Sequence, residues 1–259
     1  MDGKFLFLGT GGSMGVPVIG CSCSVCRSPS DRNKRLRSAG LLKIGSKTLL
    51  IDVGPDFRQQ ALKFQIKHLD GILLTHCHFD HIGGLDDLRV FYFIQKKALP
   101  CLLSKEMMED LKVRYDYLMQ PLSKGKSVYT QLDFQVLEGD FGLTHFEGIP
   151  IQYLSYTQAG IKVNGFRVGS FAYVSDIREY SETIFDALKG VEVLVLSSLA
   201  LLPSRMHFSV EEAIAFANRV GASMTYLTHA AHELDYEEVS RDLPSQVRLS
   251  YDGLEISFK

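Results

Sequence analysis

A cluster of histidine and aspartate residues after an apolar run constrains this chain more than any other feature. Residues 72–74 are apolar, and His76, His78, Asp80 and His81 follow shortly after them. Side chains on an extended segment alternate between two faces, so the first three start on one side. A turn after Asp80 must bring His81 round. This spacing favours two ligand pairs for two divalent ions about 3.5–4 Å apart, a geometry suited to in-line displacement. The alternative is a polar loop rich in histidine by chance, although the chain has only 8 histidines.

Composition and charge describe an ordinary globular chain. The 259 residues are 46% hydrophobic and 22% charged, which is enough for one large core, so we expect a single domain over residues 1–259. A net charge of −2 gives no general attraction to nucleic acid or to an anionic membrane surface. The N-terminal residues do not resemble a signal peptide, and no run reaches the roughly 18 apolar residues of a membrane span. We therefore expect a cytoplasmic protein.

Three cysteines form a second cluster near the N-terminus. Cys21, Cys23 and Cys26 lie in a C-x-C-x-x-C pattern, and the chain has 5 cysteines in all. Three thiols this close can reach one tetrahedral zinc but cannot all pair as disulfides. A fourth ligand must come from elsewhere, and His229 and His232 offer two imidazoles. A redox-sensitive thiol cluster is the alternative interpretation.

A glycine-rich loop over residues 9–17 follows the first expected strand. It is not a dinucleotide-binding fingerprint, because Met14 stands where the third glycine of that motif should be. A tight turn is one interpretation of the loop. The other is that Gly11 and Gly12 bind substrate by lining a phosphate site.

Strand-like and helical segments alternate through the rest of the chain. We expect a hairpin over 41–52, a helix ending near 64, a strand over 72–74, helices over 85–95 and near 107–115, a loop near 123–126, strands near 134, 149–154, 166–168 and 171–174, a helix over 179–188, a strand over 193–196, a helix after residue 209, a strand over 224–228, a helix over 235–243 and two strands that turn at 252–253. For residues 90–94, core packing is favoured over a substrate-facing wall.

The first cluster resembles the signature of the metallo-β-lactamase superfamily of metal-dependent hydrolases. With the glycine-rich loop, the cysteine cluster and L-T-H-A-A-H at 227–232, the chain is similar over nearly its whole length to the PhnP-type cyclic phosphodiesterases. This resemblance implies an α+β fold, the αββα sandwich, in which two mixed β-sheets pack face to face with helices outside. It also implies a structural zinc held by Cys21, Cys23, Cys26 and His232.

The resemblance further implies a pair of catalytic metal ions, zinc or manganese. By position, His76 and His78 would hold one ion, and Asp80, His81, His229 the other, with Asp176 shared between them. Asp176 follows an apolar strand, as a bridging ligand should; the alternative is an N-cap of the helix that follows. His207 matches an active-site histidine that is not a ligand. It would serve as phosphate donor or general acid, and a surface histidine is the alternative. Asp80 and His207 are thus the candidate catalytic residues.

The chain departs from the family pattern at two positions. Gln158 stands where the third imidazole of the first metal site is expected, so that site is expected to be weak or to prefer an oxygen-loving metal such as manganese. His145 could substitute as a ligand, but a lone histidine on a strand is more often only hydrogen-bonded. Ser197 replaces a frequent acid, and the sequence does not explain this change.

These observations predict a metal-dependent hydrolase of small or cyclic phosphate diesters that acts through a metal-bound hydroxide. The rivals are an RNA-processing nuclease of the tRNA 3′-end type and a catalytically impaired metal- or nucleotide-binding homologue. The expected partner is a small-molecule phosphodiester. Nucleic acid is disfavoured but left open, no membrane is expected, and a homodimer is left open. The natural substrate is not determined by the sequence.

Overall fold

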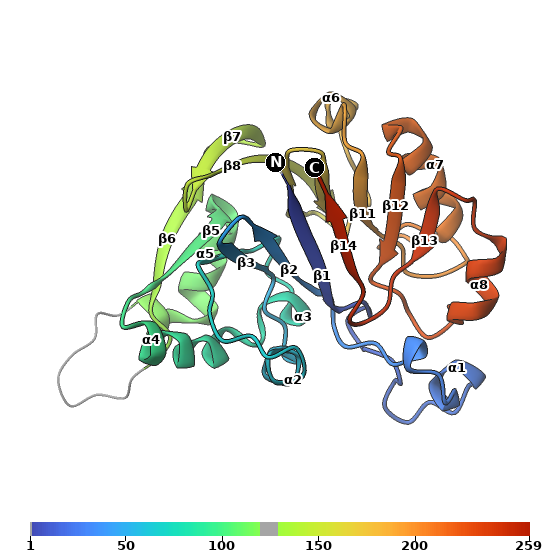
Figure 1. The fold of residues 1–259 in the computed structure, drawn as a ribbon, viewed down its shortest axis with the longest axis horizontal. Helices are drawn as coiled ribbons and strands as arrows, with labels where there is room; N and C mark the ends of the chain where they lie inside the picture. The colour runs from blue at the N-terminus through green and yellow to red at the C-terminus, as the bar shows by residue number, and fades with distance from the viewer. Residues whose placement is uncertain (1, 120–128) are drawn as a thin grey trace.

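The computed structural model describes residues 2–119 and 129–259. These residues form two sheets of seven strands (Figure 1). The first has the order β14-β1-β2-β3-β4-β5-β6, with bounds Glu255–Phe258, Gly3–Gly9, Ala39–Ile44, Lys47–Ile51, Gly71–Leu73, Leu99–Ser104 and Leu132–Leu137. The second has the order β13-β12-β11-β10-β9-β8-β7, with bounds Val247–Leu249, Met224–Thr228, Val193–Ser197, Phe171–Val174, Ile161–Val168, Ile149–Gln158 and Phe141–Phe146.

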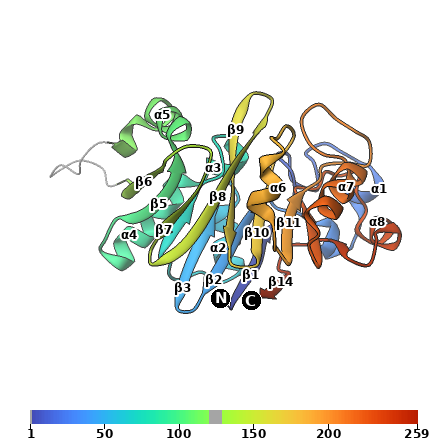
Figure 2. The same ribbon diagram turned by 90° about the horizontal axis from the view of Figure 1, so that it is seen from above.

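Helices cover the outer faces of both sheets. Figures 1 and 2 show α6, α7 and α8 together on the second sheet, while α4 and α5 lie at the opposite end of the molecule. The bounds are α1 Ser24–Arg27, α2 Phe57–Lys63, α3 Phe79–Ile82, α4 Arg89–Gln95, α5 Lys105–Arg114, α6 Thr183–Leu188, α7 Val210–Val220 and α8 Tyr236–Asp242. Short 3-10 turns occur at Asp31–Asn33, Leu85–Leu88 and Asp116–Met119.

Alternation along the strands builds the layers. In β3, Leu49 and Ile51 face the core between the two sheets, whereas Leu50 packs with the outer layer that contains Phe57 and Phe91. Each central strand must be apolar on both faces, because one face meets the other sheet and the opposite face meets helices. The predicted αββα sandwich is therefore confirmed.

Several predicted elements change at their boundaries. The helix expected over 179–188 starts only at Thr183, because Arg178 and Glu179 donate their backbone N–H groups to Thr157 of β8. The helix expected over 85–95 divides into the 3-10 turn and α4. The loop expected near 123–126 lies outside the described residues.

The core-packing prediction for residues 90–94 is correct only in part. Phe91 is buried, but Val90, Phe93 and Ile94 are 46%, 46% and 61% exposed. Helix α4 has only one face against the first sheet, so its other side chains point outward. Within residues 2–119 and 129–259, no helix is long and apolar enough to cross a membrane.

Candidate metal centre

The predicted metal-binding residues follow the C-terminal ends of three strands. The cluster at residues 76–81 comes after β4, Asp176 after β10 and His229 after β12. Strands β3 and β4 are parallel, as are β10, β11 and β12. Parallel strands end at one edge of a sheet, where sites of α/β proteins usually form. Sheet topology therefore brings together residues that lie up to 153 positions apart (229 − 76).

Four of these side chains converge with the spacing of ligands around one ion. His81 Nε2 lies 3.4 Å from Asp80 Oδ2 and 3.2 Å from Asp176 Oδ2. His229 Nε2 lies 3.5 Å from Asp80 Oδ2 and 3.2 Å from Asp176 Oδ1. Nitrogen and oxygen ligands of a tetrahedral zinc stand about 3.3 Å from one another, since each is about 2.0–2.1 Å from the metal. The four positions therefore fit a divalent metal.

Buried ring nitrogens without hydrogen-bond partners also fit a cation. His81 Nε2 and both ring nitrogens of His229 are buried and accept or donate no hydrogen bond among the described residues. Leaving such groups unpaired costs free energy, so a native structure needs a reason to retain them. A metal ion at this point would coordinate them. Asp176 and His229 also hold left-handed backbone angles, φ 57° and 61°, as strained residues at functional sites often do.

The first half of the cluster is less complete. His76 Nε2 lies 2.9 Å from His78 Nδ1, and His76, His81 and Asp176 form a second metal-competent group. Thr75 donates its hydroxyl hydrogen to Asp52, so the Thr75 oxygen must accept from Nδ1 of His76. This leaves Nε2 of His76 unprotonated, with a lone pair that faces Nδ1 of His78 and that a metal ion could take.

Electrostatics at the centre reflect two buried carboxylates among imidazoles. Burial opposes a charge on His81, yet Asp176 and Asp52 raise its pKa well above the ordinary value. Burial also opposes ionisation of Asp176, but His229 and His81 hold its pKa well below the usual range. Burial lowers the pKa of His76. The carboxylates thus require nearby positive charge, which protons on the imidazoles or a metal can supply.

Gln158 and His207 form a buried pair beside the centre. Gln158 Nε2 lies 2.8 Å from Nε2 of His207, and the His207 ring stacks on His229 at 4.7 Å between centroids. His207 Nδ1 lies 3.5 Å from Asp176 Oδ1, and burial lowers the pKa of His207 to about 4. The Gln158 carbonyl oxygen is buried and has no hydrogen-bond partner within residues 2–119 and 129–259. His207 is therefore part of the centre and not a surface histidine.

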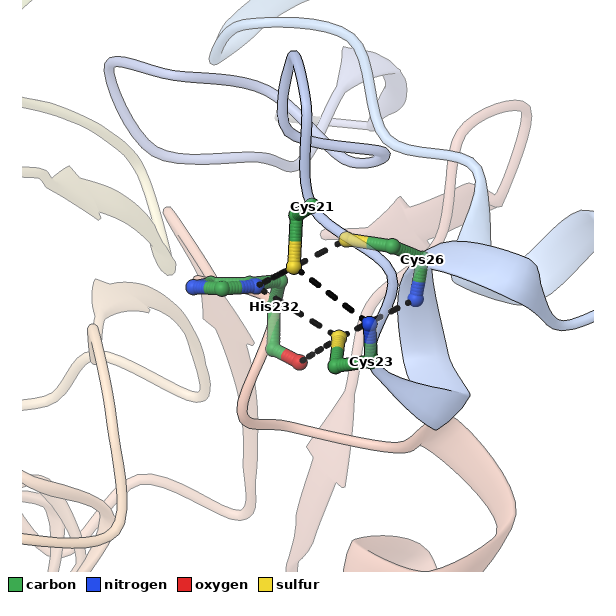
Figure 3. Close-up of side chains that lie close together, drawn as sticks. All are labelled: Cys21, Cys23, Cys26 and His232. Carbon is green, nitrogen blue, oxygen red and sulfur yellow. Dashed lines mark hydrogen bonds between the residues drawn. The ribbon is translucent and has the colours of Figure 1, made fainter.

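The cysteine cluster forms a second candidate metal site, shown in Figure 3. Sγ of Cys21, Cys23 and Cys26 lie 3.3, 3.5 and 3.6 Å from Nδ1 of His232. Three sulfurs and one nitrogen around a tetrahedral zinc would be about 3.5 Å apart, since the bonds are about 2.3 and 2.0–2.1 Å long. All five cysteines are unpaired, and the Cys26 backbone N–H is the main cause that lowers the pKa of Cys23 to about 6. This donor set fits one zinc ion.

Comparison with known proteins places the chain in a family. A model described as "Beta-lactamase superfamily domain" matches residues 47–230. A solved structure described as a new diphosphatase from the PhnP family is 33% identical, with a TM-score of 0.90, over 99% of this chain and 98% of that chain. The chain belongs to the PhnP family of the β-lactamase superfamily. It is therefore a metallo-hydrolase of the β-lactamase fold, whose members bind divalent metals such as zinc.

Two further similarities extend this assignment. The octanoyltransferase of Porphyromonas gingivalis is 32% identical over 262 residues, which cover 97% of this chain and 51% of that protein. The chain thus spans about half the length of that relative. Zinc-bound PqqB of Methylobacterium extorquens has a TM-score of 0.77 over 98% of this chain and 99% of that chain. At 17% identity, PqqB shows the shared fold alone.

Two further predictions for this PhnP-family protein concern the glycine-rich loop and His145. Gly11 and Gly12 donate their N–H groups to Leu36 and Ala230, so neither N–H is free to bind phosphate. The loop still borders the centre, because Gly12 lines a pocket that also includes His207. His145 is exposed on β7 and belongs to none of the metal-competent groups found in the described residues.

The residues that support the metal centre without facing it are harder to predict from the sequence. Asp52, after β3, accepts hydrogen bonds from the Thr75 backbone and hydroxyl and from Nδ1 of His81, the last at 2.7 Å. A carboxylate on the second ring nitrogen orients a metal-binding imidazole. In the sequence, only the position of Asp52 at the end of a strand indicates this orienting role. Ser197 is also explained, because its hydroxyl accepts from the backbone N–H of Ile177 next to Asp176.

Proposed function

We propose that this protein hydrolyses small or cyclic phosphate diesters with two divalent ions, zinc or manganese. One observation supports it above all: Asp176 belongs to two groups of possible metal ligands, one with His76 and His81 and the other with His207 and His229. Such a carboxylate is suited to bridge two ions. The PhnP-family relative is described as a diphosphatase, which supports chemistry at a phosphorus–oxygen bond.

The residues that would hold the metals are unequal in number. Asp80, His81, His229 and Asp176 would hold one ion, and His76 and His78 the other with Asp176 shared. When bound, the ions supply Lewis acidity and a nucleophile at neutral pH. Cys21, Cys23, Cys26 and His232 would hold a third, structural zinc.

The protein's own residues orient these groups and hold their protons. Asp52 holds the proton at Nδ1 of His81, and Thr75 accepts the one at Nδ1 of His76, so both Nε2 atoms point to the centre. His207 lies on the side of the centre that borders a small pocket, where it can meet a substrate oxygen. Gln158 holds its ring in place.

Metal analysis combined with a hydrolysis assay tests the proposal. We expect structural zinc plus at least one further ion per chain, and hydrolysis of bis(4-nitrophenyl) phosphate with added Zn²⁺ or Mn²⁺. Asp176→Asn should lower kcat/KM by at least about 100-fold, since it weakens a ligand of both ions. A single tightly held zinc with no turnover under any metal would contradict the proposal.

A further inference from the structure

A small pocket opens beside the metal centre and shares His207 with it. Its volume is about 150 Å³, and it lies between the glycine-rich loop at residues 12–15 and the loop that begins at Leu199. The two loops approach closely at Gly12, where a Cβ atom would meet Leu199 at 3.0 Å and the His229 ring at 3.3 Å. His207 links the two, because it lines the pocket and its Nδ1 lies 3.5 Å from Asp176 Oδ1 of the centre, so the pocket is within reach of a substituent on a phosphate bound there.

The lining of the pocket is mainly apolar. Met14, Val18, Leu199, Ala200 and Ala231 contribute side chains to it. An apolar cavity of about 150 Å³ is large enough for a benzene ring. The lining and the volume together suit one flat ring. Apolar surface continues beyond the pocket, because the residues that follow Ala200 include two leucines that are 54% and 78% exposed, Leu201 and Leu202.

The charges at the pocket disfavour an anion. No lysine or arginine is among its lining residues in the described parts of the chain, and the Glu233 carboxylate stands at its rim, 56% exposed. Two nearby arginines donate hydrogen bonds to backbone carbonyls around the pocket instead. Arg35 donates to the Ala231 carbonyl, and Arg37 donates to the Ser13 carbonyl and pairs with Asp56 at 2.9 Å. A second phosphate in the pocket would face the Glu233 carboxylate without a lysine or arginine from the lining to pair with it.

We propose that the pocket binds a flat, uncharged ring substituent of the substrate and selects against a substituent that carries a second phosphate. This inference rests on the proposed function, because it assumes that a phosphate group binds at the metal centre. This preference would distinguish the protein from an enzyme whose substrate continues as a diphosphate chain. The substrate class is then an aryl- or nucleobase-like ester of a single phosphate.

Direct binding measurements can test this without turnover. Isothermal titration calorimetry of the metal-loaded protein would use phenyl phosphate, methyl phosphate and 1,4-phenylene bisphosphate. Each probe carries a phosphate for the metals, and only the substituent differs. We expect phenyl phosphate to bind at least about tenfold more tightly than methyl phosphate, because the ring buries apolar surface. We expect 1,4-phenylene bisphosphate to bind at least about threefold more weakly than phenyl phosphate.

Variants locate the effect in the pocket. Ala200→Leu should fill the pocket and reduce the phenyl preference to less than about threefold, with methyl phosphate affinity unchanged. Met14→Ser, at a side chain 57% exposed, should likewise reduce the phenyl preference without threatening the fold. Glu233→Lys should remove the discrimination against the bisphosphate. Glu192→Lys, the same charge change at the opposite end of β11, should leave it unchanged.

The outcomes separate the two proposals. Equal affinities for phenyl and methyl phosphate, or a preference that survives both pocket variants, would overturn the inference even if diesters are hydrolysed. Tighter binding of the bisphosphate in the wild type would also overturn it. Absence of diester hydrolysis with the phenyl preference intact would instead contradict only the proposed function.

Discussion

At the scale of single residues, the metal centre depends on groups that do not themselves face the metals. Asp52 is fully buried, is held at φ 61° and accepts three hydrogen bonds, one from His81 and two from Thr75. Its carboxylate accepts from Nδ1 of His81 at 2.7 Å and so holds the proton on that ring nitrogen. The orientation of the candidate metal-binding side chains therefore depends on hydrogen bonds from residues that do not themselves face the metals.

Replacing the Asp52 carboxylate should weaken metal binding. Asp52→Asn keeps the shape of the side chain but removes its charge and an acceptor oxygen, so we expect competitive metal titration to show about 10–100-fold weaker binding of the ion held by Asp80, His81 and His229. Asp70→Asn is the matched control. Asp70 bonds Thr48 and Lys47 where β4 begins, so its loss should lower stability and leave metal affinity unchanged. Equal effects of the two variants would contradict this prediction.

Gln158 also acts at this scale. Its amide nitrogen contacts His207, and its buried carbonyl oxygen has no partner. Gln158→His would supply the third imidazole that the resemblance leads one to expect, so we predict tighter metal binding at the first site, measured by equilibrium dialysis. Gln158→Leu serves as the control, since it removes both polar atoms and adds no ligand. Unchanged metal stoichiometry in Gln158→His would show that position 158 does not face the first site.

At the scale of elements, the cysteine cluster joins two segments that are distant in sequence. The loop that carries α1 contacts the segment after β12 only a few residues from His229. Asn33 and Arg35 reinforce this contact through Asp235 and the carbonyls of Ala231 and Leu234. The cluster of three cysteines and His232 therefore supports one wall of the candidate metal centre.

Loss of one thiol should release this contact. In Cys26→Ser the cluster keeps only two thiolates, so we expect one zinc fewer per chain and a lower Tm, as for other structural zinc sites. Cys101→Ser is the control, because Cys101 is buried in β5 away from the cluster and its change should leave zinc content intact. Full zinc content in Cys26→Ser would show that the four residues do not form a metal site.

At the scale of the whole molecule, the two sheets are held by an aromatic seam. Phe5 contacts Phe7, Phe171 and Tyr173 with ring centroids 4.8–5.7 Å apart, so it joins β1 of the first sheet to β10 of the second. Phe258 stacks on Phe171 at 4.7 Å and extends this contact to β14. The candidate metal ligands come from both sheets. The ring contacts of this seam therefore also help to position the ligands of one sheet relative to those of the other.

Truncation in this seam should be costly. Phe5→Ala should lower the free energy of unfolding by about 3–5 kcal/mol, because a fully buried aromatic side chain leaves a cavity. Urea denaturation of the metal-free protein measures this change apart from ligand effects. Phe93→Ala removes the same atoms from a side chain that is 46% exposed, and should change stability by less than about 1 kcal/mol. Similar losses in both variants would contradict the role of the seam.

Much of the centre could be predicted from the sequence because its chemistry is local. Residues 76–81 place four donor groups on one short segment, and the cysteine cluster does the same for sulfur, so both patterns are legible without coordinates. The layers were predicted only through the family resemblance that these motifs carry. The helix predicted over 179–188 is wrong in its first residues, because backbone hydrogen bonds to β8 outweigh the local helical preference there.

The sequence by itself determined the family and the candidate donor residues through residue type and short spacing, and the resemblance to that family implied the sandwich. Only the tertiary structure decided how those atoms are oriented and what surrounds them. Asp52 reaches His81, Gln158 reaches His207, and an apolar pocket forms between the two loops that meet at Gly12. These relations join residues that are 29, 49 and about 190 positions apart, and only the packing of strand ends at one edge of the two sheets brings them together.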